Sequence, residues 1–299
     1  MKLDNVTSGA LAVLLVGQIM TIGWREAHRT HHVTETVRQT HTVEVPVPSK
    51  HHPAKHHHRK SAPTVSVPQQ PSTQVQSAPI DSGSSAPVHY TLSPRLRALV
   101  PTSTVLVHLV RRTPGFASPT ARRPDMHIAP RWYGHWSVLP VIATKNFRLK
   151  VRLPRRPNES TTWVRVTDVR YSRTPYAVLI DLKYRRLFWF NAGHRVASFP
   201  VGIGSPTDPT PTGSYFIAFH SPPPDPGYGP VVLATSAHSN VIQDFGGGDA
   251  IIAIHGPIDA AGLIGRSGAA ISHGCIRMQD AALSQIRGLP DGTPVVITY

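Results

Sequence analysis

A long proline-rich stretch limits how much of this 299-residue chain can fold. From about residue 28 to residue 90 the sequence mixes Pro, Ser, Thr, Gln, Val and His, and eight prolines are spread through it. Such a composition buries too little apolar surface to offset the entropy lost on ordering. We therefore expect a disordered, basic tether over residues 28–102, with the folded domains after it.

A histidine tract, His51–Lys60, lies inside this tether. Histidine tracts can bind zinc or copper. Here Lys55, Arg59 and Lys60 repel cations, and no rigid frame sets a coordination geometry. We expect incidental metal affinity and no functional metal site.

The N-terminal segment, residues 1–27, is apolar enough to enter a bilayer. Val6–Trp24 carries no charge and approaches the roughly 20 residues that a membrane helix needs. The run ends in Trp24–Arg29, which offers no small-residue cleavage site. We expect a retained membrane anchor, with a cleaved signal segment or a buried helix of a cytosolic protein as the alternatives. An anchor would place the remaining chain outside the cytoplasmic membrane, facing the cell wall, although the flanking charges do not settle its orientation.

The positive charge is confined to the first part of the chain. Residues 171–299 contain eight basic and eight acidic side chains, so the whole formal charge of +15 lies before residue 171. A basic tether and module in front of a neutral domain suggest attraction to a polyanion. Outside a membrane, the partners are anionic wall polymers or lipid head groups. Nucleic acid is not expected, because no recognition helix, zinc spacing or aromatic ribonucleoprotein motif is present.

A first folded domain is expected over residues 103–171. It contains short apolar runs separated by turn residues, and the runs at 148–153 and 163–166 alternate polar and apolar side chains, which is the strand period. Short strands in a segment of this length indicate a small β-barrel. We expect Trp132, Trp136 and Trp163 to lie in its core.

A second domain is expected over residues 175–299. Strands are predicted at 177–182, 186–190, 195–201, 213–219, 251–255 and 294–298. One short helix is predicted where Asp280 can cap its start, Leu283 and Ile286 share a face, and Gly288 can end it. The expected fold is therefore mainly β, with a C-terminal β-sandwich that contains little helix.

The candidate chemistry lies in the second domain. Cys275 is the only cysteine of the chain, so it cannot form an internal disulfide. A thiolate is a strong nucleophile, and a nearby imidazole can take its proton, so His255 and His273 are both candidate bases. Gly274 allows the backbone to bend tightly, so that consecutive amides could face an oxyanion.

The segment from His255 to Arg277 resembles the L,D-transpeptidase (YkuD-type) catalytic domain, whose motif is His-Gly followed, after a loop, by Ser/Thr-His-Gly-Cys-x-Arg/Asn. Supporting resemblances lie at Asp208–Gly213 and Phe245–Asp249. The resemblance covers about residues 175–299. The preceding stretch is similar to a small Src-homology-like β-barrel found before this domain in some actinobacterial members.

This resemblance implies an extracytoplasmic enzyme that acts on peptidoglycan without a cofactor or metal. Cys275 would attack the carbonyl of the third residue of a tetrapeptide stem, release the terminal D-alanine and form a thioester. An amine of a neighbouring stem would then form a 3→3 cross-link. His255 would be the general base and acid.

The resemblance also implies roles for the neighbouring residues. The carbonyl of Gly256 would orient the His255 ring, and the amides of His273, Gly274 and Cys275 would form the oxyanion hole. Ser272 and Arg277 would support the loop or bind substrate.

Other functions remain open from the sequence. On the same scaffold the chain could be an L,D-carboxypeptidase that uses water as the acceptor, or could attach a protein to peptidoglycan. A non-catalytic cell-wall-binding module is the third class, although the intact Cys275, His255 and Gly274 argue against it. The acceptor pocket would lie in loops such as Ser221–Gly229.

Overall fold

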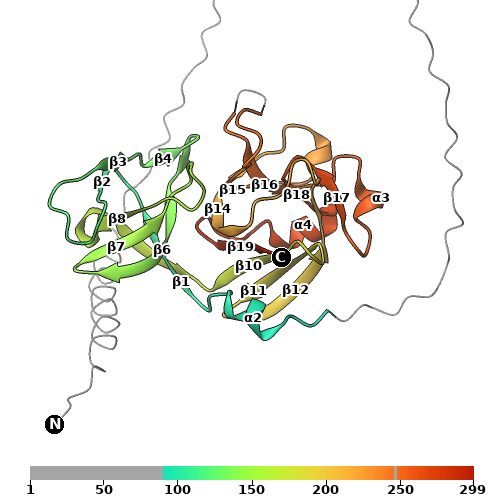
Figure 1. Ribbon diagram of the computed structural model, residues 1–299, viewed down its shortest axis with the longest axis horizontal. Coiled ribbons are helices and arrows are strands. Elements are labelled where there is room, and N and C mark those ends of the chain that lie inside the picture. The colour runs from blue at the N-terminus through green and yellow to red at the C-terminus, as the bar shows by residue number, and fades with distance from the viewer. Residues whose placement is uncertain (1–89, 246–247) are drawn as a thin grey trace, which may run out of the picture. The chain divides into compact units, whose positions relative to one another are not determined.

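The computed structural model describes residues 90–245 and 248–299 (Figure 1). The expected membrane anchor, the His51–Lys60 tract and most of the expected tether lie outside the described residues. In the described ranges, no helix combines the length and the apolar character needed to cross a bilayer.

The end of the expected tether is helical in the structure. Helix α2 (Pro94–Ala98) begins after Ser93, whose Oγ accepts a hydrogen bond from the Leu96 amide at 3.3 Å. Pro94 occupies the first turn, where a missing amide hydrogen costs nothing. This local capping signal explains an element that composition alone did not predict.

The first folded part, which we call the five-stranded unit (residues 104–174), is an antiparallel sheet in the order β8-β7-β6-β1-β9. Its strands are β1 (Thr104–His108), β6 (Val138–Lys145), β7 (Arg148–Arg152), β8 (Thr161–Arg165) and β9 (Arg170–Thr174). β9 pairs with β1 along its whole length, so the sheet extends to Thr174. Shorter elements complete the unit: β2 (Thr113–Gly115), β3 (Met126–Ile128), β4 (Arg131–Trp132), β5 (His135–Trp136) and the 3-10 helix η1 (Val166–Asp168).

The three tryptophans of this unit differ in their environments. Trp132 is partly buried and meets Phe219 edge to face, with ring centroids 5.5 Å apart. Trp163 is also partly buried. The prediction that Trp136 lies in the core is wrong: it is 51% exposed, and the Arg131 guanidinium lies 3.9 Å from its ring centroid. In the β4–β5 pair, Trp136 lies opposite Arg131, whereas Trp132 and His135 lie opposite each other and both contact Phe219, so strand alternation points Trp136 away from the core.

The second part is one ten-stranded sheet in the order β12-β11-β10-β19-β14-β15-β16-β18-β13-β17. Both halves of this curled sheet and helix α4 contribute to one core, so a single sheet folds over itself where we expected a sandwich (Figure 1). The mainly-β prediction is confirmed. The strands are β10 (Tyr176–Asp181), β11 (Arg186–Asn191), β12 (His194–Pro200), β13 (Gly202–Gly204), β14 (Gly213–Ser221), β15 (Val232–His238), β16 (Ile251–His255), β17 (Ala269–Ser272), β18 (Ile276–Arg277) and β19 (Pro294–Thr298).

The predicted helix is α4 (Asp280–Ile286), and it buries Leu283 and Ile286 as expected. Its N-cap is Gln279, which is extended, so Asp280 is the first helical residue and not the cap. An acidic side chain in the first turn still interacts favourably with the helix dipole. A four-residue helix α3 (Ala261–Ile264) and the 3-10 helix η2 (Pro226–Tyr228) add to the predicted elements.

Strand β14 is buried on both of its faces. Tyr215 and Ile217 pack into the core of the ten-stranded sheet. Phe216, Ala218 and Phe219 join the core of the five-stranded unit instead. Side chains alternate along a strand, and the register shift between Ile217 and Phe219 brings Phe219 into the same core as Ala218, so one strand supplies residues to both cores.

Candidate active site

Cys275 and His255 lie on one face of two neighbouring strands. β16 and β18 are parallel, with His255 opposite Arg277 and Ile254 opposite Ile276. Ile254 and Ile276 are fully buried in the core. The strand alternation therefore places His255, Arg277 and the preceding Cys275 on the opposite face.

The thiol of Cys275 is held by the backbone of β16. The amide of Ala253 donates to Sγ at 3.4 Å, and Sγ lies 3.9 Å from the Ile251 carbonyl oxygen. Burial raises the pKa of the thiol, while the Ala253 amide and the charge of Arg277 oppose that rise. The raised pKa favours the protonated thiol, so Cys275 would need a base in order to act as a nucleophile.

The imidazole of His255 is buried and fixed in one tautomer. Its Nδ1 lies 2.8 Å from the carbonyl oxygen of Gly256. A carbonyl only accepts, so Nδ1 donates, and in the neutral ring Nε2 retains its lone pair. The ring also packs beside Tyr228, with centroids 4.8 Å apart. The hydrogen bond implied by the family resemblance is present, and the catalytic role of His255 stays a prediction.

His255 remains neutral well below physiological pH. Burial lowers its pKa to about 4, and the positive charge of Arg277 acts in the same direction. The Gly256 carbonyl and Asp225 oppose the shift. A neutral imidazole with a free Nε2 can accept a proton, which suits a general base.

The turn from Ser272 to Cys275 is closed by the Ser272 side chain. Ser272 Oγ donates to the Cys275 carbonyl at 2.6 Å and accepts from the Gly274 amide at 3.1 Å. Gly274 has φ +114°, and a Cβ there would lie 2.7 Å from Ile252 Cδ1. The turn therefore needs glycine at this position, both for its conformation and for the close approach.

Two of the three expected oxyanion donors are available. The Gly274 amide is already bonded to Ser272, which differs from the expectation that it faces an oxyanion. The amides of His273 and Cys275 donate to no acceptor within residues 90–245 and 248–299. These two amides are the ones that could stabilise a developing negative charge.

His273 and Arg277 occupy different places around the turn. The His273 side chain is 64% exposed, and its Nε2 lies 4.0 Å from Asp208 Oδ2. Arg277 donates from Nη1 to the Pro257 carbonyl at 3.4 Å, while its buried Nε has no partner in the described part of the chain. Neither His255 nor His273 forms a hydrogen bond to Sγ among the described residues. The burial and fixed tautomer of His255 favour it over His273 as the base.

Sequence reasoning missed two contributors to the site. The buried Thr210 hydroxyl donates to the Gly274 carbonyl at 2.8 Å and accepts from the Gly204 amide at 2.8 Å. The carbonyl of Tyr228 accepts from the Gly256 amide at 2.7 Å. Both lie in segments that the sequence had marked, Asp208–Gly213 and Ser221–Gly229, but no local pattern singled out these residues.

Residues 175–297 match the model of the YkuD family, the L,D-transpeptidase catalytic domain. A curated relative from Bacillus licheniformis that bears the name L,D-transpeptidase YkuD is 29% identical over 125 residues, which are 42% of this chain and 66% of the relative. The chain thus spans slightly less than two thirds of that relative's length.

Two solved structures are similar to parts of this chain at low identity. An L,D-transpeptidase from Mycobacterium smegmatis is 18% identical with a TM-score of 0.34, covering 54% of this chain and 82% of its own. Another, from Stackebrandtia nassauensis, is 17% identical with a TM-score of 0.31; the match covers 42% of this chain and 55% of that structure's chain. Residues 175–297 of this chain belong to the YkuD family of L,D-transpeptidase catalytic domains.

Proposed function

We propose that this chain is a peptidoglycan L,D-transpeptidase that works through a thioester on Cys275. The observation that carries the proposal is that Cys275 and the neutral imidazole of His255 lie on the same face of β16 and β18. The lone pair of His255 Nε2 makes the ring a base, and the raised pKa of the thiol makes a base necessary.

In the first half-reaction, Nε2 of His255 takes the thiol proton as Sγ attacks the carbonyl carbon of the third stem residue. The carbonyl electrons move onto oxygen, where the amides of His273 and Cys275 can donate. When the carbonyl re-forms, the C–N bond breaks and the leaving amine of D-alanine takes the proton from His255. A thioester remains on Cys275.

In the second half-reaction, an amine from a neighbouring stem attacks the thioester carbonyl. His255 accepts the proton that the amine loses, and the C–S bond breaks as the new amide forms. The thiolate then recovers the proton from His255. The product is a 3→3 cross-link, and every group of the enzyme returns to its initial state.

The test is incubation of the full chain with purified tetrapeptide-containing muropeptides, followed by mass spectrometry of protein and products. We expect an acyl adduct on Cys275, released D-alanine and 3→3 dimers, and Cys275→Ala should form none of them. Tripeptide monomers without dimers would replace the proposal with a carboxypeptidase. No adduct, together with binding to intact sacculi, would replace it with a wall-binding module.

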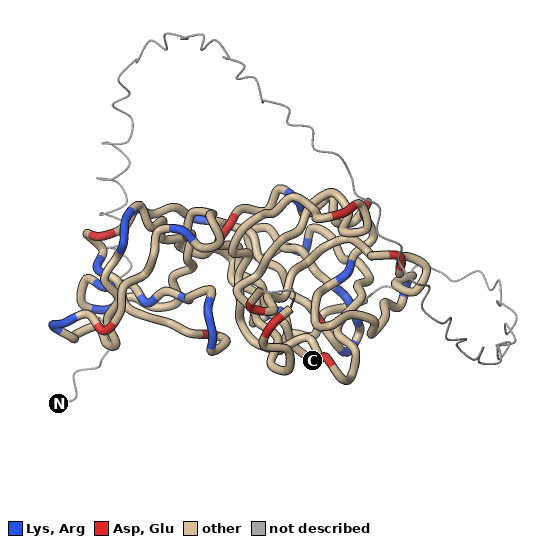
Figure 2. The backbone as a smooth tube through the Cα atoms, turned by 90° about the horizontal axis from the view of Figure 1, so that it is seen from above, with Lys and Arg blue, Asp and Glu red and all other residues tan. Residues whose placement is uncertain are grey.

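We also propose that the five-stranded unit binds an anionic wall polymer. Residues 104–174 contain fourteen basic and three acidic side chains, whereas residues 175–299 contain seven and eight. Figure 2 shows Lys and Arg spread over the whole five-stranded unit. Arg122 and Arg123 are exposed and pair with no acidic side chain in the described residues, so they are open to a polyanion.

Peptidoglycan lies outside the cytoplasmic membrane, so the proposed transpeptidase activity requires an extracytoplasmic location. The N-terminal segment, residues 1–27, would supply the anchor. Appearance of the chain in protease-accessible form on wall-stripped cells would support this location, and protection from protease would contradict it.

A further inference from the structure

One turn of the five-stranded unit reaches the catalytic domain through a single guanidinium. Arg156, between β7 and β8, donates from Nε to Asp249 Oδ1 at 2.7 Å. Its Nη1 donates to the Ser239 carbonyl at 2.8 Å, and its Nη2 to the carbonyls of Ile242 and Asp249 at 3.0 and 3.3 Å. All three guanidinium nitrogens thus bind the chain between β15 and β16, at Ser239, Ile242 and Asp249.

Asn158 adds a second connection to the same segment. Its Nδ2 donates to the His238 carbonyl at 2.8 Å, and its Oδ1 accepts from the His238 amide at 2.8 Å. Nδ2 also lies 3.0 Å from Asn240 Oδ1. The side-chain amide therefore pairs with the end of β15 as a neighbouring strand would.

Asp249 joins Arg156 to a buried histidine. His238 is fully buried, and its Nε2 lies 3.0 Å from Asp249 Oδ2. The carboxylate thus contacts an imidazole with one oxygen and a guanidinium with the other. Without the Arg156 charge, the half-exposed carboxylate of Asp249 would lie beside the buried His238 ring with no cation to neutralise it.

The segment held in this way leads directly into the candidate active site. It connects β15 to β16, and β16 carries both the Ala253 amide that donates to Cys275 Sγ and the base His255. On the same segment, the ring of Phe245 lies 6.0 Å from the ring of His273. A shift of this segment would therefore move the thiol and its base relative to each other.

We propose that Arg156 is a positioning residue: with Asn158, it fixes the chain where it leaves β15, at His238–Ile242, and where it enters β16, at Asp249, so that β16 holds Cys275 and His255 in reacting geometry. The inference rests on the proposed function. Misplacing reacting groups by about 1 Å can slow a reaction roughly 100-fold. Two residues of the five-stranded unit, Arg156 and Asn158, would then position groups of the neighbouring catalytic domain.

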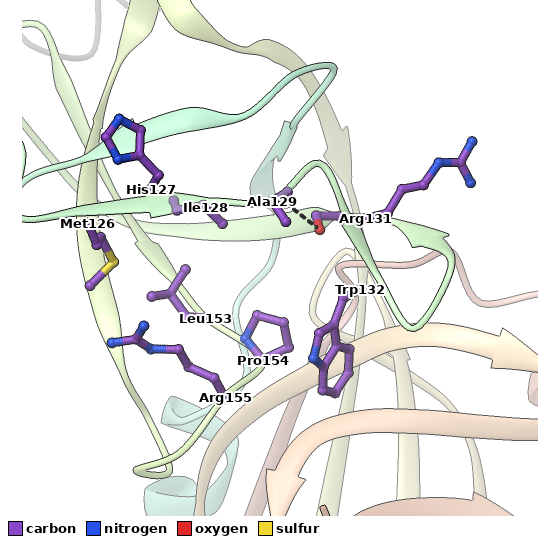
Figure 3. A pocket seen from close by; sticks show the side chains of 10 residues that line it. Met126, His127, Ile128, Ala129, Arg131, Trp132, Leu153, Pro154 and Arg155 are labelled. Atoms are coloured by element: carbon purple, nitrogen blue, oxygen red, sulfur yellow. Dashed lines mark hydrogen bonds between the residues drawn. The ribbon is translucent and has the colours of Figure 1, made fainter. Parts of the chain in front are cut away.

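Arg155 provides a matched control. It is exposed, pairs with no acidic side chain in the described residues, and lines a pocket of about 150 Å³ on the five-stranded unit. Figure 3 shows it beside Pro154 and Leu153, across from Met126. Arg155→Gln and Arg156→Gln remove the same charge from adjacent positions, and only Arg156 binds the catalytic domain.

The experiment compares Arg156→Gln, Arg156→Lys and Arg155→Gln in the full chain, with muropeptide turnover and Cys275 alkylation as readouts. We expect Arg156→Gln to lower kcat roughly 10- to 100-fold with a smaller change in KM. Arg156→Lys should recover only part of kcat, because an ammonium cannot reproduce the planar set of donors. Arg155→Gln should stay within about twofold of the unchanged protein.

Alkylation separates this inference from the proposed function, because it needs no substrate. A several-fold change in the Cys275 alkylation rate in Arg156→Gln, absent in Arg155→Gln, would support positioning even if no muropeptide reacts. Equal kcat and equal alkylation rates in the two glutamine variants would overturn it. If Arg156→Gln does not fold, Asn158→Ala tests the same segment: unchanged kcat and alkylation in that variant would overturn the inference, and lowered kcat would support it.

Discussion

The hydroxyl of Thr210 donates to the carbonyl oxygen of Gly274 at 2.8 Å, which ties a residue 64 positions away to the turn of the nucleophile. The hydroxyl oxygen of Thr210 also accepts from the Gly204 amide, so one buried side chain connects β13 to the turn that ends in Cys275. Thr210 thereby limits how far the Ser272–Cys275 turn can move.

Thr210→Val should destabilise the protein and slow acylation. Valine retains the shape but leaves the buried Gly204 amide and Gly274 carbonyl without this partner, and an unsatisfied buried polar group costs about 1–3 kcal/mol. We expect the free energy of unfolding to fall by an amount in that range, measured by denaturant titration. Thr210→Ser keeps the hydroxyl and should lose less. Equal stabilities of the Val and Ser variants would show that the hydrogen bonds do not matter.

Replacement of the two histidines should distinguish their roles. His255→Ala should slow formation of the Cys275 adduct by roughly 100-fold or more, because general acid–base catalysis usually contributes that much. His273→Ala removes an exposed ring and should have a much smaller effect. The measurement is the single-turnover rate of acylation by intact-protein mass spectrometry. A larger loss in His273→Ala would reverse the assignment of base.

The pH dependence of acylation should follow the lowered pKa of His255. Because burial favours the neutral ring and lowers its pKa to about 4, kcat/KM should fall only as the pH approaches 4, well below the usual 6.5 of histidine. The measurement is the pH profile of kcat/KM in the unchanged protein. An acidic limb centred near 6.5 would contradict a buried, neutral base.

The lowered pKa of His255 should also make the protein less stable as the pH falls. Between about pH 4 and 6.5, His255 is neutral when folded and becomes protonated when unfolded, so the unfolded state binds more protons. The contribution of His255 to the free energy of unfolding should therefore decrease as the pH falls through this window. Denaturant titrations of the unchanged protein and His255→Gln should converge toward acidic pH, and a constant difference between them would contradict this prediction.

Binding to a wall polyanion should depend on exposed arginines of the five-stranded unit. Arg122→Gln/Arg123→Gln should weaken co-sedimentation with polyanion-containing sacculi, and added salt should weaken binding by the unchanged protein, because salt screens exposed charges. Lys183→Gln/Arg287→Gln removes two exposed charges from the other domain and serves as the control. Equal binding by the two double variants would contradict the proposal.

Local patterns predicted much of this fold. Alternating residues marked β7 and β8, apolar runs marked β10 and β16, and the Leu283/Ile286 spacing marked α4. These elements are set by the pattern of residues close together in the chain, so they can be predicted from the sequence. Strands β13, β17 and β18 were not predicted, because they are only two to four residues long and are defined by pairing partners distant in the chain.

The residue types and their spacing were enough to predict Cys275 as the nucleophile and to mark the motif around it: a single cysteine after a glycine, with histidines at 255 and 273. The three-dimensional fold was needed to learn which histidine is buried and held in one tautomer, which amides are left to donate, and that Arg156 binds Asp249, 93 positions away. The physical reason is that residue identity sets the available chemistry, whereas burial and long-range hydrogen bonds set pKa values and geometry. The parallel pairing of β16 and β18 is what brings Cys275 and His255, far apart in the chain, onto one face of the sheet.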